Sequence, residues 1–352
     1  MHDEPTVILS EAKDLLLYSR KADPSGSALR MTTPILRVAL ALLAAAALPA
    51  FAQSYPAKPV KLVVSSAAGG SPDLQARIFT QRMSQLHGYV WVIENVPGAG
   101  ANIAPERVAK APADGYTLLM ASAGPLYFNP TLYAKLAYDI QRDFEPITQV
   151  SNVPNILAVH PSVPLHTVKE LIDYAKANPG KLRFGTPGSG SSQHLSGELF
   201  KKMSGVDMQH VPYKSVAQMT TELVSGQFEL SFNNAPLVLP HIKSGRLRAL
   251  AVTTRTRLAL APDIPTLDES GLAGFEVGGG SGVLAPKGTP DAILRKLETD
   301  LRSVLNSAEV REQYAANGLI AVGSSSAEFA AYMKSEIARW APLIRATGAT
   351  VD

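Results

Sequence analysis

The sequence contains no cysteine. A chain without thiols forms no disulfide framework and performs no thiolate chemistry. Its seven histidines show no HExxH or comparable ligand spacing, so we predict neither a metal site nor a cofactor. The absence of cysteine is compatible with export to a bacterial periplasm but does not require it.

The sequence also has little excess of charge of either sign, because 33 Lys and Arg nearly balance 30 Asp and Glu. The formal net charge is +3. The basic residues are scattered along the chain, and no aromatic residues cluster with arginine. Recognition of nucleic acid requires a concentrated basic surface. We therefore predict no nucleic-acid partner.

The most prominent apolar run is Val38–Leu48, which is too short to span a bilayer. Arg37 precedes it, and Ala50-Phe51-Ala52 follows with the small-x-small pattern of a cleavage site. We predict a secretory signal peptide over residues 31–52, a mature chain that begins at Gln53, and a periplasmic location. Residues 1–30 do not fit ahead of an export signal. We interpret them as the result of a start codon assigned too far upstream, with a genuine cytoplasmic extension as the alternative.

From residue 60 onward, segments typical of buried strands alternate with segments of helical periodicity. The first strands each end in a loop of small residues. This alternation predicts an α/β fold with mostly parallel sheets covered by helices on both faces, and ligands of such sheets bind beyond the carboxyl ends of the strands. The strands are expected at 60–64, 90–93, 116–120, 156–159, 182–184, 228–232 and 247–253, with a return crossing at 278–282 and a helical C-terminal region.

One of these loops has the composition of an anion site. Gly185, Gly188 and Gly190 permit positive φ and a close approach of the backbone to a ligand. The following helix, expected to begin near Ser192, aims unpaired N–H groups into the same space. Its first turn contains no carboxylate, and a protonated His194 would attract an anion. The alternative is an ordinary tight turn from strand to helix.

A second helix start follows the strand at 60–64. Ser71 is expected as its N-cap, Pro72 at its first position and Asp73 in its first turn, where a carboxylate stabilises the helix dipole. The same charge would repel an anionic ligand. Either Asp73 faces away from the site or it holds a positive or hydroxyl group.

Catalytic signatures are missing: the loops contain Gly-Ser-Gly-Ser-Ser but no GxSxG elbow, no G-K-[ST] and no complete GxGxxG. We predict no catalytic residue. What remains is a set of hydrogen-bond donors suited to a carboxylate. For Tyr213 and Lys214, a tyrosine packed under a loop and a solvated lysine are as good an interpretation as contact with a ligand. The donors are the backbone at Ala68–Gly70, Ala123 and Gly188–Ser191, and the side chains of Ser122, Ser189, His194, Tyr213, Lys214 and Asn234.

Several longer stretches resemble the periplasmic solute-binding receptors of tripartite tricarboxylate transport, the Bug receptors. The similarity covers residues 55–352 and includes YPAKPVKLVV, GGSPD, ENVPGAGANIA, DGYTLLM, NPTLY, PGKLRFGTPGSGSSQHLSGELF, HVPYK, LPHIKSGRLRALAVT and GVLAPKGTP. The resemblance implies a two-lobed type II periplasmic-binding-protein fold, here a monomer, that closes on a small organic carboxylate and presents it to membrane permease subunits. It places the binding loops at Ser66–Asp73, including Ala68 and Gly69, and at Ser122-Ala123, Gly188–His194, Tyr213-Lys214 and Asn233-Asn234.

Two departures from the family pattern affect the ligand. Ser65-Ser66-Ala67-Ala68 stands where the family usually has Pro-Phe-x-Pro, and Phe232-Asn233-Asn234 stands where Phe-Asp-Asn is frequent. Ligand identity is therefore not carried over from the family.

The resemblance and the strand pattern together predict the organisation of the mature chain. Lobe 1 is expected at residues 53–155 plus 278–352, and lobe 2 at 156–277. Two other functions stay open at this point: a periplasmic Ser-dependent hydrolase, and a receptor that feeds a sensor kinase.

Overall fold

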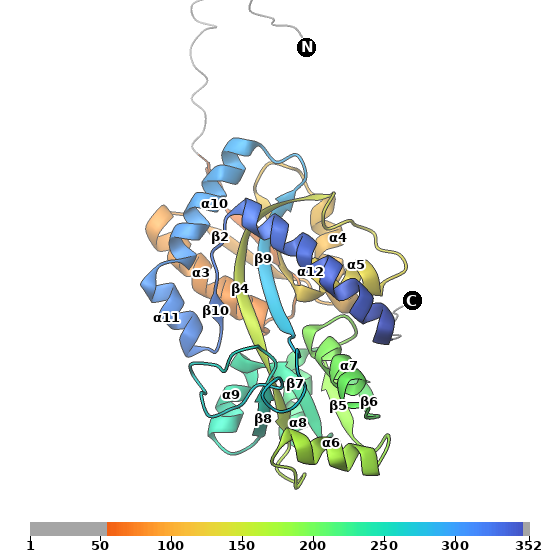
Figure 1. The fold of residues 1–352 in the computed structure, drawn as a ribbon. Helices are drawn as coiled ribbons and strands as arrows, with labels where there is room; N and C mark the ends of the chain where they lie inside the picture. Colours follow the sequence, from red (N-terminus) through yellow and green to blue (C-terminus); the bar gives the residue numbers. More distant parts are fainter. Residues whose placement is uncertain (1–54, 348–352) are drawn as a thin grey trace, which may run out of the picture. The chain divides into compact units, whose positions relative to one another are not determined.

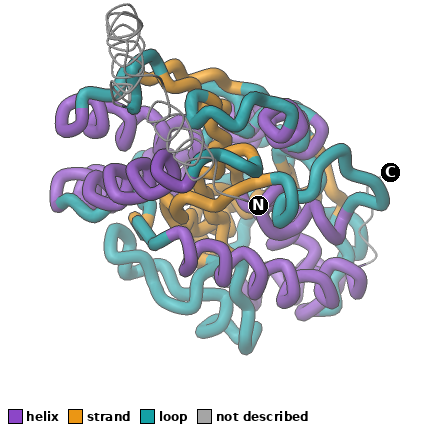
Figure 2. Tube along the Cα trace, turned by 90° about the horizontal axis from the view of Figure 1, so that it is seen from above, coloured by secondary structure: helices purple, strands orange, loops and turns teal. Residues whose placement is uncertain are grey.

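The computed structural model describes residues 55–347 of the 352-residue chain, and these belong to one compact unit. The predicted signal peptide and residues 1–30 lie outside the described residues. Among the described residues, eight strands form one path of pairing in the order β2-β1-β3-β9-β4-β7-β5-β6, and β8 and β10 pair with β4 beside this path. Figure 2 shows the strands between helices on both sides.

The first half of the described chain contains three strands and their helices. Its elements are β1 (Val60–Val64), α3 (Ser71–His87), β2 (Trp91–Asn95), η2 (Ala99–Ala101), α4 (Ile103–Ala109), β3 (Thr117–Ser122), η3 (Gly124–Phe128) and α5 (Asn129–Leu132). β1 pairs in parallel with both β2 and β3, as the strand pattern predicts.

The second half begins along the long strand β4 (Phe144–Val159). It continues through α6 (Val168–Ala177), β5 (Arg183–Thr186), α7 (Ser192–Ser204), β6 (Gln209–Pro212), α8 (Val216–Val224), β7 (Leu230–Asn234), α9 (Ala235–Lys243) and β8 (Arg248–Val252). β5 pairs in parallel with β6 and β7. The chain then returns through β9 (Gly278–Pro286) to α10 (Asp291–Leu305), α11 (Ala308–Ala316), β10 (Ile320–Ala321) and α12 (Ser326–Thr347).

β4 and β9 run together through the fold (Figure 1) and make the sheet mixed. β4 pairs antiparallel with β9 up to Pro154, and from Asn155 onward with β7 and β8. At Asn155 β4 thus passes from pairing with β9 to pairing with β7. The predicted α/β two-lobed fold is confirmed, with parallel pairs inside each lobe and antiparallel pairs along β4 and β9.

Helix α3 differs in one detail from the sequence prediction. Its N-cap is Gly70, and Ser71 is already the first helical residue. The buried face of α3 also contains the polar side chains Asp73 and Gln75, which matter for the site.

Candidate ligand-binding site

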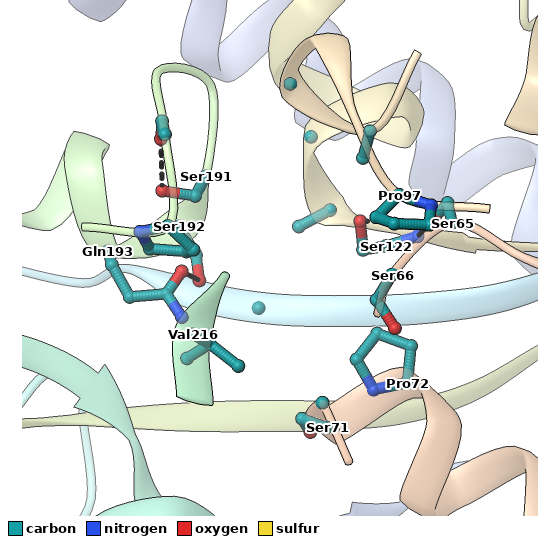
Figure 3. A pocket seen from close by; sticks show the side chains of 18 of the residues that line it. Ser65, Ser66, Ser71, Pro72, Pro97, Ser122, Ser191, Ser192, Gln193 and Val216 are labelled. Atoms are coloured by element: carbon teal, nitrogen blue, oxygen red, sulfur yellow. Dashed lines mark hydrogen bonds between the residues drawn. The ribbon is translucent and has the colours of Figure 1, made fainter. Parts of the chain in front are cut away.

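A cavity of about 490 Å³ lies between the two lobes. Loops at the carboxyl ends of β1, β2, β3, β5, β6 and β7 contribute to it, as expected for an α/β sheet. Figure 3 shows Ser191, Ser192 and Gln193 on one side of the pocket and Ser65, Ser66, Ser71 and Pro72 on the other. Among residues 55–347, those that line the cavity include no Asp, Glu or His, and Lys214 is the one formally charged residue among them.

The structure brings most of the predicted site residues to this cavity. Those in its lining are Ser66, Ser122, Ala123, Gly188, Ser189, Ser191, Tyr213, Lys214 and Asn234. Ala68, Gly69, Asp73 and His194 are not among the lining residues. Contact of any of them with a ligand stays a prediction.

Asp73 lies outside the residues that line the cavity, and other groups of the protein occupy its carboxylate. Its Oδ2 accepts from the Gly69 N–H at 2.9 Å and from Arg77 Nε at 3.0 Å, and its Oδ1 accepts from Asn95 Nδ2 at 3.0 Å. Burial raises the pKa of Asp73, but the hydrogen bonds from Arg77, Gly69 and Asn95 outweigh it and hold the pKa below the usual range. The loop before α3 therefore already holds an anion of its own.

The start of α7 is different, because the residues that carry its unpaired N–H groups line the cavity. Ser191 is the N-cap: its Oγ accepts from the His194 N–H at 3.2 Å and donates to the Gly188 carbonyl oxygen at 2.8 Å. The N–H groups of Ser192 and Gln193, the first two of the helix, have no intrahelical partner. Both residues line the cavity.

Two glycines shape the loop before α7, with φ of 114° at Gly188 and 80° at Gly190. Gly185 was predicted to share this role, but it lies in β5 with ordinary φ, and its missing side chain instead makes room for the Phe228 ring. A Cβ on Gly124 of lobe 1 would lie 2.8 Å from the Gly190 carbonyl oxygen. The loop therefore also contacts the opposite lobe.

His194 lies outside the residues that line the cavity, and its contact with a ligand stays a prediction. Its ring lies 4.5 Å from that of His210, and the ring of His210 stacks on Phe184. Burial, with His210 and Lys201 nearby, lowers the pKa of His194 to about 3, and burial together with Lys201 lowers the pKa of His210 to about 4. Both rings are neutral at pH 7, and His194 Nδ1 accepts from the Gly190 N–H at 3.4 Å.

This buried pair makes the fold sensitive to acid. The two folded-state pKa values lie below the ordinary value near 6.5, so the unfolded chain takes up protons first as the pH falls. The contribution of these two histidines to the free energy of unfolding is fully present above pH 6.5 and declines toward pH 4. The decline is about 1.4 kcal/mol per pH unit for each proton that only the unfolded chain takes up. His194→Gln should flatten the dependence of the melting temperature on pH over this interval. The exposed His166→Gln is the matched control, and equal slopes for both variants would contradict the assignment.

Four polar side chains form a closed ring of hydrogen bonds in the lobe 2 wall. Gln193 Nε2 donates to Asn234 Oδ1 at 3.1 Å, Asn234 Nδ2 donates to Asn155 Oδ1 at 2.6 Å, and Asn155 Nδ2 donates to Ser192 Oγ at 3.2 Å. Ser192 Oγ closes the ring by donating to Gln193 Oε1 at 3.2 Å. Asn155 is fully buried at the point where β4 changes partners. The ring thus joins the start of α7 to the strand that links the lobes.

Sequence reasoning missed several lining residues. Ser65 Oγ accepts from the Ser122 N–H at 2.9 Å and donates to Ser122 Oγ at 3.3 Å, so these serines pair with each other. Ser65 was noted as a departure from the family pattern, but nothing in the sequence indicated that its side chain turns inward. The others missed include Gln75, Val153, Ser215, Val216 and Gly279–Ser281.

Two lobes joined by shared strands, with a donor-lined cavity between them, define a two-lobed solute-binding protein. Residues 75–349 match the model of the tripartite tricarboxylate transporter family receptors. The chain belongs to this family, whose members are periplasmic solute-binding receptors.

Relatives and solved structures agree with this assignment. Protein BugT of Bordetella pertussis is 36% identical over 304 residues, which cover 86% of this chain and 93% of BugT. The structure of Rhodopseudomonas palustris Rpa4515 with adipate aligns with a TM-score of 0.81 and 37% identity over 84% of this chain and 98% of that one. MatC from the same species, with bound malate, aligns with a TM-score of 0.78 and 30% identity over 82% of this chain and all of that one. Periplasmic binding protein BugD aligns with a TM-score of 0.80 and 35% identity over 84% of this chain and 99% of that one.

Proposed function

We propose that this chain captures a small organic carboxylate in the cavity between its lobes and delivers it to the membrane subunits of a tripartite tricarboxylate transporter. The observation that carries the proposal is the start of α7, where Ser192 and Gln193, whose N–H groups have no intrahelical partner, line a cavity that has no carboxylate among its described lining residues. A helix N-terminus attracts anions through these unpaired donors and through the helix dipole. The adipate and malate in the related structures support this class of ligand.

The proposal also states where the receptor acts and in which form. The receptor acts as a periplasmic monomer after removal of residues 31–52, and protein recovered from the periplasm should have the mass of a chain that begins at Gln53. Within the described residues 55–347, no helix is long and apolar enough to cross a membrane.

Closure of the lobes is a further part of the proposal. Lobe 1 comprises residues 53–155 and 278–352, lobe 2 comprises 156–277, and the crossings near Asn155 and Gly278 serve as hinges. Thr253 holds the two crossings together: its Oγ1 donates to the carbonyl oxygens of Val277 at 2.6 Å and Asn155 at 3.2 Å. The change of pairing partners within β4 supports a hinge at this position.

A thermal-shift screen of short mono-, di- and tricarboxylates tests the function. Ligand stabilisation follows RT ln(1 + [L]/Kd), about 2.7 kcal/mol at a concentration one hundred times Kd. We expect one or a few acids to raise the melting temperature and their neutral methyl esters to fail. Solution scattering at saturation should then give a smaller radius of gyration than the empty protein. Esters that stabilise as well as the free acids would contradict a carboxylate site, and identical scattering curves would contradict closure.

A further inference from the structure

The loop before α7 meets lobe 1 at a close contact that involves the buried side chain of Asn129. A Cβ on Gly190 of this loop would lie 2.4 Å from Asn129 Oδ1. A Cβ on Gly100 of lobe 1 would lie 3.0 Å from the Ser189 carbonyl oxygen, and the contact between Gly124 and Gly190 lies beside it. Glycines on both sides therefore let the backbone of one lobe come very close to the other lobe.

The orientation of the Asn129 amide is fixed by its neighbours in lobe 1. Its Nδ2 donates to the Gly100 carbonyl oxygen at 2.9 Å and to Asn102 Oδ1 at 2.7 Å, so both hydrogens are used. Tyr138 holds Asn102 in turn, because its hydroxyl donates to the same Oδ1 at 2.7 Å. A backbone carbonyl oxygen can only accept. The nitrogen of the Asn129 amide must therefore face Gly100, and its oxygen faces Gly190.

This amide oxygen has no hydrogen-bond donor in the protein. Asn129 is fully buried, and no group among residues 55–347 donates to its Oδ1. The Gly190 N–H points to His194 Nδ1, at 3.4 Å. The Cα hydrogen of Gly190 that points toward Oδ1 is at most a weak donor. A buried acceptor without a donor is unfavourable, because it has lost its hydrogen bonds to water without replacement.

The unfavourable term exists only while the two lobes are in contact at this point. Gly190 belongs to lobe 2, so rotation about the hinges proposed above separates it from Asn129 and lets water reach the amide oxygen. The term therefore acts on the equilibrium between open and closed forms and not on the folding of either lobe. A ligand held between the lobes supplies the favourable free energy that offsets it.

We propose that Asn129 disfavours closure of the empty receptor and thereby makes closure depend on a ligand. Asn129 lies outside the cavity lining, so it is a positioning residue that acts through the arrangement of the lobes. The membrane subunits then meet a closed receptor only when it carries a ligand. This inference rests on the proposed function, because it takes the lobes to open and close around a carboxylate.

The test removes the amide oxygen in Asn129→Ala. In solution scattering, the empty wild type should have a larger radius of gyration than the loaded wild type, and the empty variant should approach the loaded value. The variant should also bind the best carboxylate about fivefold or more tighter, with dissociation slower by a similar factor, since an unsatisfied buried acceptor corresponds to about fivefold to a hundredfold in an equilibrium constant. Asn129→Ser also withdraws the oxygen from Gly190, and it repeats the comparison if Asn129→Ala does not fold.

Asn102→Ala is the matched control, because it breaks the same hydrogen-bond network of lobe 1 and leaves Asn129 Oδ1 against Gly190. It should neither compact the empty protein nor tighten binding. Gly124→Ala has the opposite effect on closure, since its Cβ would lie 2.8 Å from the Gly190 carbonyl oxygen and its φ is not positive. In a protein with this replacement, Asn129→Ala should no longer tighten binding.

The outcomes separate this inference from the proposed function. If Asn129→Ala keeps the wild-type radius and affinity, or if Asn102→Ala shifts both as strongly, the role of Asn129 is wrong while carboxylate binding stands. An empty wild type with the radius of the loaded protein contradicts it as well. If no acid of the screen binds, the proposed function fails, and the radii of the empty wild type and empty Asn129→Ala still decide whether Asn129 opposes closure.

Discussion

Ser191→Asp is expected to weaken binding of the best carboxylate by about tenfold to a hundredfold or more. Ser191 caps α7, and the N–H groups of Ser192 and Gln193 beside it are the donors proposed for the ligand. An aspartate there places a negative charge against the bound anion and supplies a competing acceptor for the same N–H groups. A lost charge-assisted hydrogen bond is worth roughly 1.5–3 kcal/mol, which gives this change in affinity.

The empty protein should keep its stability, since aspartate is as good an N-cap as serine. Ser191→Asn separates charge from size, because it can cap the helix without a negative charge and should bind nearly as the parent does. Ser307→Asp makes the same replacement at the N-cap of α11, outside the cavity lining. Calorimetric titration of all three variants checks the prediction. Unchanged affinity in Ser191→Asp would show that the carboxylate does not lie at the start of α7.

The sequence predicted the parallel parts of the fold well, because apolar runs followed by small-residue loops are local signals. β1 has the predicted bounds, and α7 begins at the predicted residue. β4 was predicted only over its last four residues, although it runs from Phe144 to Val159. Pro146 and Pro154 concealed the rest, since proline argues against a central strand. A register shift after Pro146 accommodates the first of them in the structure.

Three helices that contain proline, α9, η3 and α5, were missed for the same reason. α9 includes Pro236 and Pro240, and η3 and α5 begin with Pro125 and Pro130 near their first residues. Tertiary packing stabilises these segments: Val238 and Leu239 of α9 belong to a buried cluster with residues of β4 and β8. Packing of this kind overrides local helix propensity and cannot be predicted from a short stretch of sequence.

The site shows a similar division. Loop residues such as Gly188 and Ser191 were predicted to lie together because strand ends converge at one edge of a sheet. Gln75 was missed because a glutamine within a helix has no local signature. Its place in the cavity wall depends on hydrogen bonds from Ser151 and Ser281, which are distant in sequence. The neutral state of His194 was likewise hidden, since it follows from burial beside His210.

Asn155→Leu is expected to be the most destabilising single change in the site region. Asn155 is fully buried, accepts from Asn234 Nδ2 at 2.6 Å and donates to both Ser192 Oγ and Ser196 Oγ at 3.2 Å. Leucine has a similar volume but neither donor nor acceptor, so the Asn234 amide loses its acceptor inside the protein, and each such buried orphan costs about 1–3 kcal/mol. We expect a loss of about 3 kcal/mol, or about 5 °C in melting temperature at an unfolding entropy of about 2.1 cal/mol/K per residue.

The matched control is Asn152→Leu on the same strand. Asn152 is only half-buried and accepts a single hydrogen bond, from Gln149 Nε2 at 2.8 Å, so its replacement should cost about 1 kcal/mol or less. Asn155→Leu should also weaken carboxylate binding, because opening the ring loosens Ser192 and Gln193, whose N–H groups are the donors proposed for the ligand, whereas Asn152→Leu should not. Thermal unfolding and calorimetric titration of both variants decide the point. If the two replacements cost the same stability and leave affinity equal, the ring neither holds the lobe 2 wall together nor positions the start of α7 for a ligand.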